Sequence, residues 1–91
     1  MAVEVRLPTL LRPAVGGASS VSAEGATVGD VFADLTHRFP ALAGQVVDEA
    51  GGLHKFVNVY RNDDDIRYLE ALDTKLADGD VVSILPAVAG G

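Results

Sequence analysis

The sequence predicts an α+β fold in which one main helix covers one face of a small sheet. Three observations support this class. Apolar residues alternate with polar ones near both ends of the chain, one stretch has helical periodicity, and glycine- and aspartate-rich turns separate these segments. The segments follow in the order strand, strand, helix, strand, short strand, strand, which is typical of a helix packed on a sheet.

The first two strands are predicted to form a hairpin. Residues 3–7 alternate apolar and charged side chains, as expected of a strand with one buried face. Pro8 and Pro13 bracket the end of this strand, and Gly16 and Gly17 turn the chain. A weaker strand pattern then covers residues 18–23, close enough to pair with the first strand.

The main helix is predicted to begin after Thr27, whose hydroxyl can cap the first turn while Asp30 reaches back. Pro40 ends it, and residues 41–47 can form one further helical turn. The apolar stripe of this helix must pack on the sheet, where each buried side chain contributes on the order of 1.5–3 kcal/mol. Its members are Val28, Val31, Phe32, Leu35 and Phe39.

The C-terminal half supplies the remaining strands. Residues 53–61 are rich in Val, Phe and Tyr and predict a strand with apolar residues on both faces. Residues 62–65 are Asn and three Asp, which predict a turn, and residues 66–67 predict a very short strand. A second turn at residues 78–80 leads to the last strand, residues 81–85.

The last strand has two alternating sets of side chains. Val82 and Ile84 are predicted to face the core, so that Val81, Ser83 and Leu85 face the other way. Leu85 is then an exposed apolar residue near the C-terminus, where it can serve as a docking surface. The pattern allows equally that both sets are buried by neighbouring segments.

Composition excludes several classes of function. The 91 residues contain no internal repeat, which indicates one domain with no room for a deep enzyme cleft. Thirteen acidic and seven basic residues give a net charge of −6, which opposes binding to nucleic acid or anionic membranes. The absence of cysteine excludes disulfides, thiolate metal sites and iron–sulfur clusters. Without a transmembrane run or signal segment, a soluble cytoplasmic protein is expected.

No constellation of side chains indicates a catalytic or metal site. Residues 63–65 lack the glycine and distal glutamate of a calcium loop and are interpreted as a solvated turn. His37 and His54 have no partner at the spacing of a metal site or a serine triad. The glycine pairs 16–17 and 51–52 lack the lysine and hydroxyl of a phosphate loop. We therefore expect no catalytic residue, metal or cofactor in the chain itself.

The chain ends at Gly90 and Gly91, directly after an apolar stretch. Because glycine has no Cβ, two terminal glycines can thread a narrow channel into the active site of another protein. The terminal carboxylate would then be the functional group. Small residues are also common at disordered chain ends, so the glycine pair alone leaves both interpretations open.

Residues 76–91 resemble the C-terminal signature of the ubiquitin-like sulfur carriers of the MoaD/ThiS family, and the whole chain matches them in length and element order. Residues 8–13, 53–60 and 85–91 are similar to the actinobacterial carriers of cysteine biosynthesis. The resemblance implies a β-grasp fold, a mixed sheet of four to five strands covered on one face by the main helix. It implies a domain over residues 1–86 and a flexible tail over residues 87–91.

The resemblance also implies a covalent chemistry at Gly91. In the family, a ubiquitin-activating-like adenylyltransferase and sulfurtransferase uses Mg-ATP to convert the terminal carboxylate into an acyl-adenylate. Sulfur then displaces AMP and leaves a thiocarboxylate. For the actinobacterial carriers the acceptor is a pyridoxal-phosphate (PLP) cysteine synthase acting on O-phosphoserine, and a metalloprotease later releases cysteine. Mg-ATP and pyridoxal phosphate belong to these partners, and the carrier needs no cofactor.

On this interpretation the site residues lie at the end of the chain. Gly91 supplies the acyl carbon, Leu85 is the expected contact for partners, and Pro86 sets the angle at which the tail leaves the strand. The residues expected to thread into the partner are Gly90, Ala89 and Val88.

Other functions remain open at this point. One is a carrier that serves molybdopterin, thiamin or a secondary metabolite instead of cysteine. A second is a ubiquitin-like protein modifier conjugated to lysines of target proteins. A third is a structural interaction domain whose terminal glycines are incidental.

Overall fold

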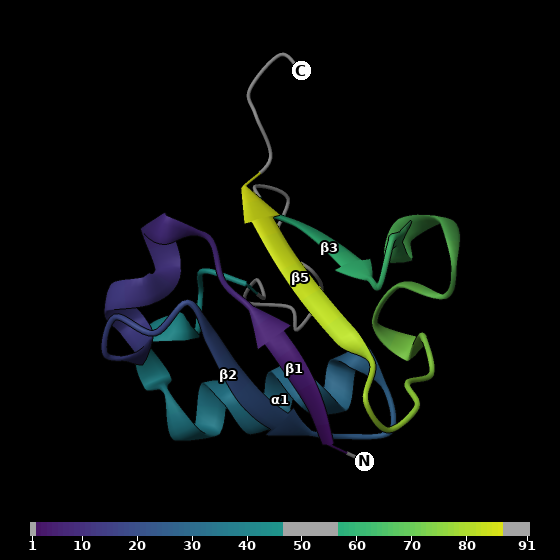
Figure 1. Cartoon of the computed structure of the whole chain (residues 1–91), viewed down its shortest axis with the longest axis horizontal. Helices are drawn as coiled ribbons and strands as arrows, with labels where there is room; N and C mark the ends of the chain where they lie inside the picture. Colours follow the sequence, from purple (N-terminus) through teal and green to yellow (C-terminus); the bar gives the residue numbers. More distant parts are fainter. Residues whose placement is uncertain (1, 47–56, 87–91) are drawn as a thin grey trace.

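The structure of the chain, a computed structural model, describes residues 2–46 and 57–86. They form a five-stranded mixed sheet with one α-helix across one face (Figure 1). The strands are β1 (Ala2–Arg6), β2 (Ser20–Glu24), β3 (Val57–Arg61), β4 (Asp64–Asp65) and β5 (Val81–Pro86). The helices are α1 (Val28–Arg38) and the short 3-10 helices η1 (Thr9–Val15), η2 (Pro40–Leu42), η3 (Ile66–Tyr68) and η4 (Ala71–Asp73).

The sheet has the strand order β2-β1-β5-β3-β4, with β5 at its centre. β1 pairs antiparallel with β2, as the predicted hairpin requires, and parallel with β5. β3 pairs antiparallel with both β5 and β4. The expected sheet of four to five strands under one main helix is therefore confirmed.

The core lies between the sheet and α1. The helix buries Val28, Val31, Phe32 and Leu35, and Phe39 packs half-buried at its end. Thr27 caps its first turn as predicted, because the Thr27 Oγ1 accepts a hydrogen bond of 3.1 Å from the Asp30 N–H. The expected return bond from the Asp30 side chain to Thr27 is not formed within the described residues. The helix ends at Arg38, two residues before Pro40.

The connection between β1 and β2 differs from the sequence prediction. Residues 9–15 form η1, which the proline and glycine signals did not indicate, and Leu11 and Val15 of η1 are buried in the core. The predicted turn after it is confirmed, since Gly16 and Gly17 have φ angles of 71° and 87°, the left-handed region that glycine tolerates. β2 consequently begins at Ser20 rather than at residue 18.

The segment after β3 also differs. Residues 62–63 turn the chain, but Asp64 and Asp65, predicted within the turn, pair with β3 as β4. Residues 66–67, predicted as a strand, begin η3, because the Asp65 Oδ1 accepts a hydrogen bond of 2.9 Å from the Arg67 N–H and caps a helical turn. Residues 53–56 of the predicted third strand and residue 47 of the predicted helical turn lie outside the described residues.

Asp80 fastens the start of β5 to the end of β3. Its Oδ2 accepts a 2.8 Å hydrogen bond from the Ala77 N–H and a 3.0 Å bond from the Arg61 Nε. Its Oδ1 accepts a 3.3 Å bond from the Asn62 Nδ2. These donors favour the carboxylate and lower the pKa of Asp80, with the Ala77 N–H as the largest cause. The bonds hold the final turn in the conformation that leads into the central strand.

We expect Phe32→Ala to lower the free energy of unfolding by about 3–5 kcal/mol, because Phe32 is 1% exposed and its removal leaves a cavity. The measurement is urea unfolding followed by circular dichroism. The matched control is His37→Ala on the exposed side of the same helix, with a change within about 0.5 kcal/mol. Equal effects of the two substitutions would contradict the packing described here.

The Asp80 bonds also predict a pH dependence of stability. Because the pKa of Asp80 is lower in the folded chain than in the unfolded chain, its contribution is complete at neutral pH. The contribution is lost as pH falls below the ordinary value of 3.8 and through the folded pKa.

Asp80→Asn should therefore reduce the stability at neutral pH and flatten its decline on acidification, measured by urea unfolding from about pH 7 to about pH 3. The decline should persist in part, because Asp34, which accepts from the Glu24 N–H and from Arg38, also has a lowered pKa. Asp73→Asn, at an exposed carboxyl of the same connection, is the control. An unchanged pH profile in Asp80→Asn would refute the role of these bonds.

Candidate functional site

The end of β5 has one buried and one open side. Val82 and Ile84 are 0% and 1% exposed, whereas Leu85 is 46% exposed and Pro86 is also exposed. The predicted alternation is therefore confirmed. The alternative of burial on both sides is wrong, because the opposite face is covered only in part, with Val81 and Ser83 half-buried.

Leu85 and Pro86 are the last described residues before the expected tail. They pair with Asn58 and Val57 of β3, which determines where the chain leaves the sheet, at the top of β5 in Figure 1. The predictions for Val88, Ala89, Gly90 and Gly91 lie outside the described residues. The structure thus describes the point from which the tail starts.

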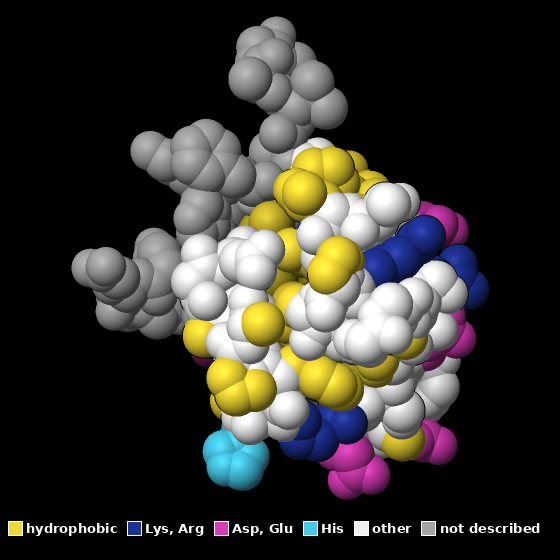
Figure 2. All heavy atoms as spheres, turned by 90° about the vertical axis from the view of Figure 1, so that its left-hand side faces the viewer, with side chains coloured by type: hydrophobic (Ala, Val, Ile, Leu, Met, Phe, Trp, Pro, Cys, Tyr) yellow, Lys and Arg dark blue, Asp and Glu magenta, His cyan; other side chains and the backbone are white. Residues whose placement is uncertain are grey.

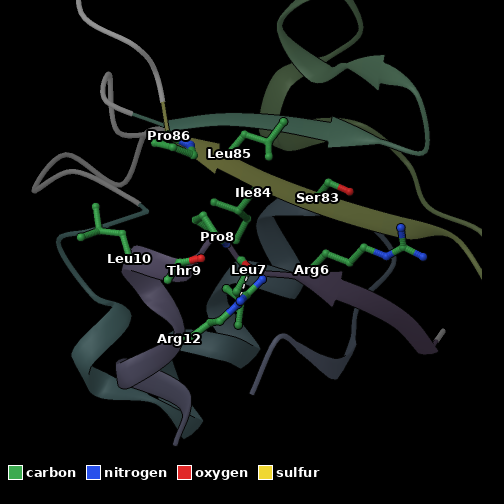
Figure 3. A pocket seen from close by; sticks show the side chains of 10 residues that line it. All are labelled: Arg6, Leu7, Pro8, Thr9, Leu10, Arg12, Ser83, Ile84, Leu85 and Pro86. Carbon is green, nitrogen blue, oxygen red and sulfur yellow. Dashed lines mark hydrogen bonds between the residues drawn. The ribbon is translucent and has the colours of Figure 1, made fainter. Parts of the chain in front are cut away.

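A groove of about 590 Å³ lies beside this point, between η1 and the end of β5 (Figure 3). Leu85 and Pro86 lie along one wall and Leu10 at the end of the other. The residues that line the groove are Arg6, Leu7, Pro8, Thr9, Leu10, Arg12, Ser83, Ile84, Leu85 and Pro86. The two predicted docking residues are therefore part of a larger surface.

The contribution of η1 to this groove was missed by sequence reasoning. Leu10 is 75% exposed and Leu11 is 4% exposed, because adjacent residues of a short helix point in different directions. The adjacent leucines Leu10 and Leu11 after Pro8 could have indicated this helix. A single helical turn packed on the sheet can bury only one of two adjacent side chains, so the other one must be exposed. η1 thereby places an aliphatic side chain opposite the end of β5.

A second cavity of about 200 Å³ continues this surface. It shares Pro8, Leu10 and Pro86 with the first groove and is also lined by Leu11, Gly44, Gln45 and Val57. Figure 2 views the molecule from the η1 side and shows apolar side chains on this face, with Lys or Arg side chains at its margins. The apolar surface therefore extends from β5 across η1.

The remaining candidate residues carry no site in the described part of the chain. Among residues 2–46 and 57–86, no three His, Asp or Glu side chains cluster as metal ligands. Of the predicted solvated turn at residues 63–65, Asp63 is exposed in the turn, whereas Asp64 and Asp65 form β4. His37 is exposed on α1 and Lys75 is also exposed. His54, Lys55 and the glycine pair at residues 51–52 lie outside the described residues. Of the helices described, none is long and apolar enough to cross a bilayer.

The comparisons with known proteins agree on one family. The model of the ThiS family matches residues 5–91. Sulfur carrier protein CysO of Mycobacterium tuberculosis is 50% identical, with all of both chains covered. Its crystal structure superimposes with a TM-score of 0.89 at 49% identity, over 94% of this chain and 99% of the other.

Two further relatives extend the comparison. A chain in the crystal structure of the BexX/CysO complex of Amycolatopsis orientalis gives a TM-score of 0.89 at 46% identity, over 98% of this chain and 99% of that one. Small archaeal modifier protein 3 of Haloferax volcanii is 38% identical, with both chains covered completely. From the match over residues 5–91 and the shared β-grasp architecture, we conclude that the chain belongs to the ThiS family of ubiquitin-like sulfur carriers.

Proposed function

We propose that this protein carries sulfur as a thiocarboxylate on Gly91. The identity of 50% to CysO across the full length of both chains is the observation that carries this proposal. It is supported by the groove at the end of β5, which offers a partner an apolar surface beside the start of the tail. On this proposal the chain is a carrier on which other enzymes act, and it is not itself a catalyst.

The chemistry follows from the poor reactivity of a carboxylate. The Gly91 carboxylate attacks the α-phosphorus of ATP on a ubiquitin-activating-like adenylyltransferase, and pyrophosphate leaves. A sulfur nucleophile then attacks the acyl carbon and AMP leaves with one of the original carboxylate oxygens. The product is a C-terminal thiocarboxylate, in which sulfur replaces that oxygen. Mg-ATP is bound by the partner, and a reaction that uses ATP suits the expected cytoplasmic location.

The proposed tail meets the steric demand of this reaction. Residues 87–91 span up to about 17 Å when extended, so the acyl carbon can enter an active site while the folded body stays outside. Gly90, Ala89 and Val88 have no long side chains to obstruct this entry. Leu85 and Pro86 would contact the partner at the mouth of its channel.

We further propose cysteine biosynthesis as the pathway that receives the sulfur. On a pyridoxal-phosphate cysteine synthase, the thiocarboxylate sulfur would form a bond to the β-carbon of O-phosphoserine as phosphate leaves, and its bond to the acyl carbon of Gly91 would be kept. The amino acid product would remain attached to the carrier until a metalloprotease releases it. The similarity to CysO supports this assignment over carriers for molybdopterin, thiamin or a secondary metabolite.

Protein modification is the second candidate function. The 38% identity to small archaeal modifier protein 3 of Haloferax volcanii favours it. An activated Gly91 can react with a lysine amine of a target protein as well as with sulfur. The two functions share the adenylation step and differ in the nucleophile that follows it.

We expect the intact mass to rise by about 16 Da on incubation with the activating enzyme, Mg-ATP and sulfide, because one oxygen becomes sulfur. Intact-protein mass spectrometry measures this change. A chain truncated before Gly90 is the matched control and should show no gain. High-mass conjugates that depend on Gly91, seen without any gain of 16 Da, would support the modifier function instead.

A further inference from the structure

The groove between η1 and β5 combines an apolar end with a cationic end. In Figure 3, Leu10, Pro86 and Leu85 lie toward one end, and Arg6 and Ser83 lie toward the other. Leu10 and Leu85 are 75% and 46% exposed, so both sides of the groove offer aliphatic surface to a ligand. Such a surface fits an occupant that is itself part apolar and part charged.

Arg12 is the central cation of this groove. Its Nε donates a 3.2 Å hydrogen bond to the Leu7 carbonyl oxygen, which holds the half-buried side chain in place (Figure 3). Within residues 2–46 and 57–86, the terminal nitrogens of this guanidinium form no other hydrogen bond and no carboxylate forms a salt bridge with it. A guanidinium held in this way can bind a carboxylate through two parallel hydrogen bonds.

The charge of the groove is opposite to that of the chain. The net charge is −6, yet the described residues that line the groove include two arginines and no Asp or Glu. Arg6 forms a 2.8 Å salt bridge with Glu4, but both side chains are largely exposed, so this pair is weak and can exchange partners. An acidic partner segment is therefore repelled by most of the surface and attracted here.

We infer that the groove binds a segment of the activating enzyme in which a carboxylate side chain stands next to an aliphatic or aromatic one. The apolar side chain packs between Leu10 and Leu85, and the carboxylate pairs with Arg12, while Arg6 lies toward the cationic end of the groove. This inference rests on the proposed function for the identity of the partner. Because the groove adjoins Pro86, this contact orients the carrier as its tail enters the enzyme.

The experiment measures the affinity of the purified activating enzyme for the full chain by calorimetry, at about 50 and about 300 mM NaCl. Arg12→Glu should weaken binding about tenfold or more at low salt, and less at high salt, because salt screens the added repulsion. Thr9→Glu places a carboxylate in the same groove at an exposed side chain that forms no hydrogen bond within the described residues. Thr9→Glu should also weaken binding to the enzyme, so the inference can be tested even if Arg12→Glu fails to fold.

Lys75→Glu is the matched control, because it makes the same change of charge at an exposed residue outside the groove. It should change the affinity by about twofold at most. Equal affinities for Thr9→Glu and Lys75→Glu at both salt concentrations would overturn the inference. A dimer of the wild-type chain that Leu10→Ser converts to a monomer would also overturn it, since a second copy would then occupy the groove.

The sulfur-carrier proposal is tested separately in the same samples. With saturating enzyme, Thr9→Glu should still gain the mass of one sulfur, because its Gly91 is unchanged. If the wild-type chain binds with the expected dependence on Thr9 and Arg12 but never gains this mass, the proposed chemistry fails and the docking surface stands. If the wild-type chain does not bind the enzyme, both fail.

Discussion

The double pairing of β5 is the constraint on which the rest of the structure depends. This last strand pairs parallel with the first strand, β1, and antiparallel with β3, and it buries Val82 and Ile84 under α1. Parallel strands end at the same edge of a sheet. η1, which follows β1, therefore lies beside Pro86 at the point where the chain leaves β5. The topology alone brings the groove between η1 and β5 to the base of the proposed tail.

The charges of the chain are distributed unevenly around this site. Residues 62–80 contain seven acidic and two basic residues, a net charge of −5 out of the −6 of the whole chain. They form the connection from β3 to β5, on the side of Figure 1 opposite η1. The groove contains Arg6 and Arg12 instead. In the docking that we infer, where the partner presents a carboxylate, this asymmetry would favour one orientation of the body.

Local sequence patterns predicted the elements that depend on local physics. Alternation identified β1 and the buried face of β5, and the spacing of Val28, Val31, Phe32 and Leu35 identified α1. The parallel pairing of β1 with β5 joins strands about 75 residues apart, which no local pattern encodes. η1 was missed because Pro8 and Pro13 signal an interruption, whereas Pro13 is accommodated in a 3-10 helix anchored by Leu11. Because sequence reasoning missed η1, it also missed the side of the groove that η1 forms.

The central claim is that a chemically inert body delivers the carboxylate of Gly91 to an enzyme. One additional bulky residue after Gly91 tests it most directly. We predict that a chain extended by one tryptophan unfolds at the same urea concentration as the wild type, because a residue added to the proposed tail should leave the packing of the described core unchanged. The extended chain should not be adenylated, since its carboxylate cannot reach through a channel that fits only glycine. Normal formation of a thiocarboxylate on the extended chain would contradict the account.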